Sequence, residues 1–178
     1  MIVISKKVLM DVARWFVYFL EIVFLYALER SYNLIPEVFG GRPLILIPAF
    51  ITIAIFEKEY ASMVFGIIIG CFLDVSIGNF VGIQAIFLFI IGYILGVLFT
   101  YFVNLNFVTF FFTSLIIIPL TFGYRFLFFY IIPGFNNVQY ALLYHLVPSV
   151  CYTVVISPVV YFVNRYVAYW VRFRKAGA

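Results

Sequence analysis

The chain has 178 residues, of which 67% are hydrophobic and 10% are charged. Soluble domains carry about a quarter charged residues, so this composition excludes an ordinary soluble domain and indicates an integral membrane protein. The formal net charge of +4 is small, and no basic stripe is present outside the membrane ends. We therefore interpret the excess of basic residues as a topology signal and expect no binding of nucleic acid.

Six apolar segments follow one another, which is what the length allows at roughly 20 residues per membrane span. We expect spanning helices over residues 12–30, 43–56, 61–73, 82–103, 107–132 and 140–161. No small-residue cleavage site precedes the first of them, so we expect an uncleaved helix. Residues 162–178 form a basic, aromatic-rich amphipathic tail, which is typical of an anchor at the cytoplasmic membrane surface. The expected fold is a single all-α membrane domain.

The first expected span carries Glu21 near its centre. A carboxylate at that depth is costly, so it should face protein or be neutral. Two interpretations stay open. Glu21 is either an acid that helps helices pack through a hydrogen bond, or an acid that contacts a partner helix or a buried cation.

The second expected span begins at Pro43, directly after Arg42. Proline suits the first turn of a helix, where its missing N–H has no intrahelical partner. Gly40 and Gly41 precede this start and favour a break in the chain. Because this span is short, we expect it either to cross with little tilt or to begin inside the bilayer.

The third and fourth expected spans share a pattern of small residues. Gly66 and Gly70 lie four residues apart on the third, and Gly92 and Gly96 repeat this spacing on the fourth. Residues four apart lie on one face of a helix, and small residues there let two backbones approach closely inside lipid. The spacing predicts a tightly packed pair of helices.

Asp74 continues the glycine spacing of the third span and is expected to close it, with Gly78 and Gly82 in the turn that follows. A carboxylate at a helix C-terminus opposes the helix dipole. We therefore expect Asp74 either to cap the following turn or to pair with a basic residue.

The fifth and sixth expected spans contain prolines and two basic side chains. We expect Pro119 to kink the fifth span, and Pro148 and Pro158 to interrupt the sixth. Arg125 lies about 10 Å from the far end of the fifth span, where it can snorkel to the surface or pair with an acid. His145 is expected to be a hydrogen-bonded packing residue, because no second histidine or Cys–acid set accompanies it as a metal site would require.

Six spans would put both chain ends on one side of the membrane. Basic residues gather on that side: Lys6, Lys7, Arg14, Lys58, Arg165, Arg172, Arg174 and Lys175. The positive-inside rule then predicts cytoplasmic termini. Arg42, Asp74 and Arg125 would meet at the outer face, and we hypothesise that Asp74 pairs there with one of the two arginines in an outer polar cluster.

No catalytic constellation is recognisable in the sequence. It lacks HExxH, GxSxG and a glycine-rich loop with a Walker lysine, and its two aspartates, Asp11 and Asp74, are expected at opposite faces. Cys71 and Cys151 both lie in apolar runs, so we expect small core residues without a disulfide or a metal. We expect a protein without enzymatic activity and without a cofactor.

The stretch from Arg42 to Gly96 resembles the MreD family, the rod shape-determining membrane proteins of bacteria. The positions that carry the resemblance are Arg42–Pro43, Glu57–Lys58–Glu59, Gly66, Gly70, Asp74, Gly78, Gly82, Ala85, Gly92–Tyr93 and Gly96. Two positions depart from the family pattern. Leu44 stands where an acid is frequent, and Gln84 stands where asparagine is usual.

The resemblance implies a scaffold in the bacterial plasma membrane that takes part in cell elongation. Such proteins bind MreC, a single-span protein with an extracytoplasmic domain, and help to organise the peptidoglycan polymerase and transpeptidase together with MreB filaments. The resemblance also implies a compact six-helix bundle similar to the substrate-binding subunits of energy-coupling-factor vitamin transporters.

A subunit of such a vitamin transporter is the alternative function. It would have the same size and span number, and it would need an outward pocket in which polar and aromatic groups converge. Those subunits usually carry an AxxxA pattern on the first helix for docking their partner. The first span here is bulky throughout and lacks that pattern, so we favour the scaffold.

Overall fold

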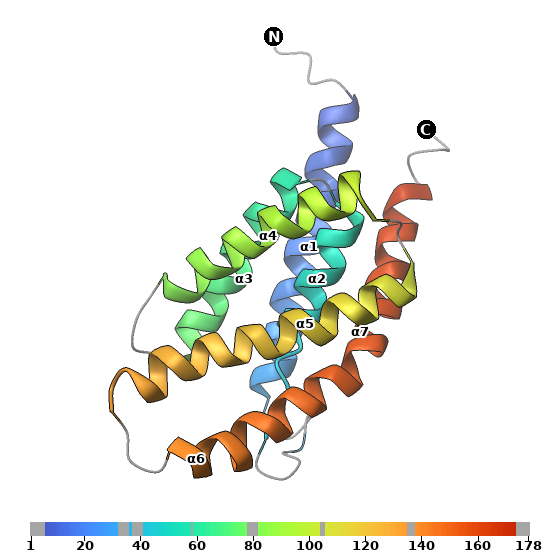
Figure 1. Cartoon of the computed structure of the whole chain (residues 1–178). Coiled ribbons are helices and arrows are strands. Elements are labelled where there is room, and N and C mark those ends of the chain that lie inside the picture. Colours follow the sequence, from blue (N-terminus) through green and yellow to red (C-terminus); the bar gives the residue numbers. More distant parts are fainter. Residues whose placement is uncertain are drawn as a thin grey trace.

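The structure is a computed structural model that describes residues 6–31, 36, 41–57, 59–77, 82–103, 106–134 and 138–173. Its elements are α1 (Lys6–Arg30), α2 (Leu46–Phe56), α3 (Glu59–Ile77), α4 (Ile83–Tyr101), α5 (Phe107–Phe126), α6 (Val138–Ala141) and α7 (Val147–Phe173). Two π-helical turns are continuous with these helices: η1 (Leu127–Ile131) extends α5, and η2 (Leu142–Leu146) joins α6 to α7. The beginning of α1 and the end of α7 lie at the same end of the bundle (Figure 1).

Within the residues that the structure describes, three helices are long and apolar enough to cross a membrane. They cover Ile83–Tyr101, Phe107–Ile131 and Val138–Tyr169. Their outer surfaces expose large apolar side chains, among them Ile90, Ile94, Phe112, Ile116, Val155 and Val159. A surface of this kind is stable against acyl chains and not against water, so the chain is an all-helical protein embedded in a membrane.

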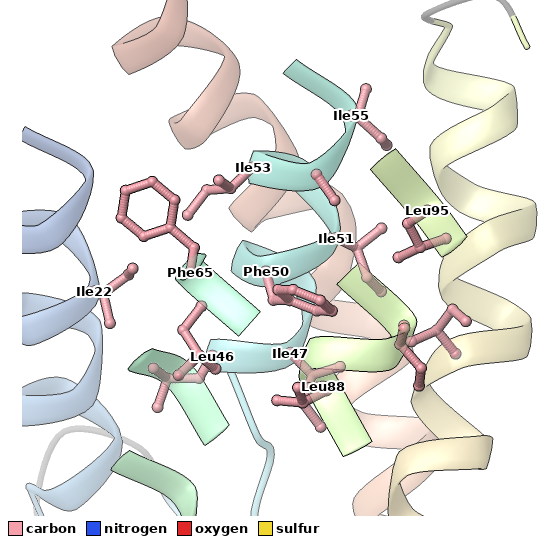
Figure 2. Close-up of a cluster of buried hydrophobic side chains, with 14 of the residues drawn as sticks. Ile22, Leu46, Ile47, Phe50, Ile51, Ile53, Ile55, Phe65, Leu88 and Leu95 are labelled. Atoms are coloured by element: carbon pink, nitrogen blue, oxygen red, sulfur yellow. The ribbon is translucent and has the colours of Figure 1, made fainter. Parts of the chain in front are cut away.

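Helix α2 forms the centre of the bundle. Every residue from Leu46 to Ile55 is buried, so no side of this helix faces the outside. This explains why its sequence is apolar on all sides and not on one face only. Figure 2 shows Phe50 and Ile51 of α2 among Phe65 of α3 and Leu88 of α4. With 11 residues, α2 is about 16 Å long, roughly half the hydrocarbon thickness of a bilayer.

Helices α3 and α4 form an antiparallel hairpin whose backbones touch. A Cβ atom added at Gly66 would lie 2.5 Å from the carbonyl oxygen of Leu88, and one added at Gly70 would collide with the backbone of Ala85. These obstacles are main-chain atoms, which cannot rotate out of the way. The two glycines of α3 therefore set the distance between the helices.

The two glycines of α4 make the matching contacts toward the other end of the hairpin. A Cβ at Gly92 would lie 2.6 Å from the carbonyl oxygen of Ser62, and one at Gly96 would lie 2.7 Å from the Cα of Glu59. All four glycines of the sequence pattern thus lie in the α3–α4 contact, which extends over the length of both helices.

Several expected element boundaries differ from the structure. Helix α3 continues to Ile77, so Asp74 lies in its last turn and does not end it. Pro158 lies inside α7, which runs on to Phe173, so the expected interruption there is wrong, whereas the expected end of the membrane span at residue 161 stays a prediction. Pro158 has no N–H for the carbonyl of Val154, but the Ser157 hydroxyl donates to that carbonyl at 2.8 Å. The lost hydrogen bond is replaced, and the helix continues.

We predict that Gly70→Ala destabilises the protein by about 1–3 kcal/mol, because the new methyl group forces α3 away from the backbone of Ala85. The measurement is thermal unfolding of the purified protein in detergent. Gly123→Ala is the control, because a Cβ on that helical glycine of α5 meets nothing within 4 Å. Equal melting temperatures for the two variants would contradict the assigned role of Gly70.

Candidate functional site

The Asp74 carboxylate caps the start of α4. It is 1% exposed and accepts hydrogen bonds from the backbone N–H groups of Gly82 at 2.8 Å, Gln84 at 3.1 Å and Ala85 at 3.3 Å. The first N–H groups of a helix have no intrahelical partner, and a negative charge there also suits the helix dipole. Gly82 has a φ of 112°, a left-handed conformation that glycine adopts without strain, and this bends the chain onto the carboxylate.

The hypothesised ion pair of Asp74 with Arg42 or Arg125 is not what the structure shows. Within the described ranges, the carboxylate is engaged by three backbone N–H groups, and Arg125 acts on it at longer range only. The physical reason is that these buried donors already satisfy the carboxylate without removing an arginine from water. Of the two alternatives that the sequence left open for Asp74, the structure has the cap.

A second carboxylate, Glu29, has the same role at the start of α2. It comes from the last turn of α1 and accepts the backbone N–H of Leu46 at 3.3 Å. The backbone N–H of Leu44, just before this helix, donates to the Thr153 hydroxyl of α7 at 3.1 Å. Glu29 is not among the residues predicted above from the sequence. The available signal was an acid at the end of one apolar span, shortly before a short span that begins with proline.

A cavity of about 430 Å³ lies where these helix ends meet, at the end of the bundle away from the start of α1 and the end of α7. Its lining comes from α1, the segment before α2, α5 with η1, and α6 to α7. The lining residues are Glu29, Arg30, Arg42, Pro43, Leu44, Phe122, Arg125, Phe126, Phe129, Tyr130, Ala141, His145, Leu146 and Ser149. Because Arg30, Arg42, Tyr130 and His145 are exposed, the cavity is open to the outside of the molecule.

The segment before α2 is fixed against the first turn of α7 and forms one wall of this cavity. Gly41 approaches so closely that a Cβ on it would lie 2.6 Å from the backbone nitrogen of Ser149. Pro43 is buried in the same wall. The glycine and the proline that mark this turn in the sequence therefore hold Arg42, which lies between them, at the rim.

The described part of the cavity lining carries a positive charge. Among the lining residues that the structure describes are three arginines and one glutamate, which together have a formal charge of +2. Arg30 lies over the ring of Tyr26, with 5.7 Å between its Cζ and the ring centroid, as in a cation–π contact. Arg125 lies within electrostatic range of Glu29 and Asp74, yet it forms no ion pair with any residue that the structure describes. Arg125 is half-buried and lines the cavity.

The two π-helical turns, η1 and η2, lie on either side of the cavity. Turn η1 contributes Phe129 and Tyr130, and η2 contributes His145 and Leu146. The ring of Tyr130 stacks on Phe126, with 5.1 Å between the centroids. Single π-helical turns are frequent at functional sites because the wider turn redirects side chains. Here they give the cavity aromatic and apolar walls beside its arginines.

The remaining residues predicted from the sequence lie elsewhere. Glu21 lies on α1 about 12 Å from Glu29 along the helix, and its two buried carboxylate oxygens have no hydrogen-bond partner among the described residues. Gly78 lies outside the described residues. Cys151 is exposed on α7, so the expectation of a core residue is wrong for it, because α7 buries the face of Thr153 and Ser157 instead.

A buried ion pair lies at the opposite end of the bundle. Arg14 of α1 approaches Glu57, directly after α2, with 3.3 Å between Nη2 and Oε2. The Glu57 side chain is 3% exposed. In the part of the chain that the structure describes, no group of three or more His, Cys, Asp and Glu side chains could hold a metal. The arginine-lined cavity is therefore the candidate functional site.

Comparisons with known proteins give no relative for this chain: neither a protein-family model nor a curated protein nor a solved structure matches it. A function must therefore be argued from the residues themselves. Two arrangements offer a basis: the α3–α4 hairpin with its glycines and its aspartate cap, and the cavity that holds Arg30, Arg42 and Arg125.

We predict that Asp74→Ala lowers the free energy of unfolding by about 2–4 kcal/mol, because it leaves three N–H groups at the start of α4 buried without an acceptor. Asp74→Asn should lose less, since its amide oxygen still accepts hydrogen bonds. Thermal unfolding in detergent compares the two variants with the wild type. An alanine variant as stable as the wild type would show that water or other groups satisfy these donors.

Proposed function

We propose that the chain is a membrane scaffold of the bacterial cell-elongation machinery, of the MreD type, and that its direct partner is the single-span protein MreC. The observation that carries this proposal is the α3–α4 hairpin. The residues that resemble the MreD pattern are those on which the hairpin depends, namely the glycines Gly66 and Gly70 at the helix contact and Asp74 with Gly82 at its turn.

A rigid hairpin supports a scaffold rather than a catalyst. Backbone contact along α3 and α4 fixes the shape of the surface that these helices offer to a neighbour in the membrane. The long apolar faces of the bundle, such as that of α1 with Phe16, Leu20 and Phe24, are exposed and suit contact with another helix. Through such a partner the chain would help to organise the peptidoglycan polymerase, the transpeptidase and MreB filaments, without chemistry or a cofactor of its own.

The topology that we propose has six spans and cytoplasmic ends. To the three long apolar helices it adds α1, α3 and the enclosed α2, which would cover only half of the bilayer. Among the basic residues of the described helices, Lys6, Lys7, Arg14, Arg165 and Arg172 belong to the first half of α1 or the last third of α7, toward the end of the bundle where α1 begins and α7 ends. The positive-inside rule then favours a cytoplasmic location for that end in the bacterial plasma membrane.

We predict that affinity purification of the detergent-solubilised chain, from a bacterial host that makes both proteins, recovers the MreC partner. Mass spectrometry of the purified complex measures the recovery. A matched control is an unrelated six-span protein with the same tag, expressed to the same level. Failure to recover MreC in that host, with the chain folded and abundant, would count against the scaffold.

We also predict that a reporter fused after residue 178 stays on the cytoplasmic side. A fluorescent protein that folds in the cytoplasm should be bright there, and an alkaline phosphatase fusion at the same position should be inactive. The opposite pattern would exclude the proposed topology, since it requires an odd number of spans or an inverted orientation.

The vitamin-binding subunit of an energy-coupling-factor transporter remains a second candidate because of the cavity. Its volume of about 430 Å³ lies within the usual range of small-molecule sites, and aromatic and polar groups converge on it. This function predicts tight, saturable binding of a vitamin to the purified protein, which isothermal titration calorimetry would measure. Absence of binding across the water-soluble vitamins would remove this candidate.

A further inference from the structure

We propose that the arginine-lined cavity binds an anionic phosphate group attached to an apolar body. The inference rests on the cavity alone and holds whether or not the chain is a scaffold. Its basis is the charge of the lining, the depth of Arg125 in the bundle and the apolar walls beside it.

The charge of the lining selects an anion. Among the described lining residues Glu29 is the one acid, and its carboxylate already accepts the N–H of Leu46 at the start of α2, where the helix dipole stabilises its negative charge. The guanidinium group of Arg125, which forms no ion pair with a described residue, offers a planar fork of donors that matches phosphate oxygens, and Arg30 and Arg42 add positive charge around the same space. A cationic or neutral ligand would have to enter against this field, whereas an anion would relieve it.

The position of Arg125 suggests the level of the anion in the membrane. It precedes the last residue of η1, Ile131, by six positions, or about 9 Å along the helix. A snorkelling arginine from that depth reaches the boundary between the hydrocarbon and the head groups, where lipid phosphates lie. A charged arginine at this depth needs a partner, and Arg125 forms no ion pair with a described residue. Water or an anion in the cavity would therefore have to stabilise its charge.

The apolar walls suit the rest of the ligand. Phe122, Phe126 and Phe129 line the cavity next to Arg125, and Leu146 lines it from the other side. The neighbouring helix surfaces expose Leu127 and Leu143, which face outward as lipid-contacting side chains do. A phosphate held by the arginines would thus leave its apolar portion against aromatic rings. A phospholipid fits this description, and so does a soluble organic phosphate with an apolar group.

The test uses the full-length protein in a mild detergent, titrated with phosphatidylglycerol, phosphatidylcholine and glycerol 3-phosphate, with bound ligand measured by native mass spectrometry. We expect saturable binding of phosphatidylglycerol over phosphatidylcholine, weakened about tenfold in Arg125→Gln. Glu29→Gln should bind several-fold more tightly, because it removes the negative charge and keeps an acceptor for Leu46. Arg165→Gln, an equal charge change on the exposed face of α7, should bind as the wild type does.

The outcomes distinguish a phospholipid from a soluble organic phosphate as the ligand, and they also show when the proposal fails. Binding of glycerol 3-phosphate with the same dependence on Arg125 would support the site with a soluble ligand. Equal binding of both lipids, or equal losses in Arg125→Gln and Arg165→Gln, would overturn it. If Arg125→Gln does not fold, Arg42→Gln at the exposed rim replaces it, with an expected loss of at least severalfold. Vitamin binding without competition by phosphate would also overturn this inference, and it would favour the transporter subunit over the scaffold.

Discussion

The bundle depends on carboxylates that cap the buried N-termini of two helices. A helix that begins inside a membrane protein exposes N–H groups to a medium without water, and each such group costs free energy when it has no acceptor. Asp74 of α3 provides the acceptor for α4, and Glu29 of α1 provides it for α2. In both cases the acid comes from the last turn of the preceding helix. Each carboxylate thereby connects the end of one helix to the start of the next.

This arrangement accounts for the acids at the cavity end of the molecule. Two acids are required there for the helix starts, and arginines at the same level balance them at a distance. Arg125 lies within electrostatic range of both Glu29 and Asp74. Glu29 also lines the cavity, so the start of α2 and the candidate functional site share this acid.

The sequence predicts some of these features well, because a few residue patterns have a single physical use in lipid. Glycines four residues apart on two neighbouring spans favour close helix–helix contact, and the structure places these glycines between α3 and α4. The partner of Asp74 was harder to predict. Any residue can offer a backbone N–H, so such donors leave no mark in the sequence, whereas arginines are visible and suggested an ion pair.

Two further differences have the same origin. Pro158 marks a break in the sequence, but the hydroxyl that compensates for it belongs to the ordinary residue before it, Ser157. The cavity could not be located from sequence because it forms where the ends of α1, η1 and η2 meet the segment before α2. Such a meeting depends on where helices end to within one turn, which is the least predictable property of a helix.

The enclosure of α2 has a consequence for biosynthesis. Its neighbours include α5 and α7, which a ribosome delivers after α2 has already entered the membrane. Until they arrive, part of the central helix must rest against lipid or against the insertion machinery. The bundle is therefore incomplete through most of synthesis, and α2 is enclosed on all sides only after α7, the last helix, has been made.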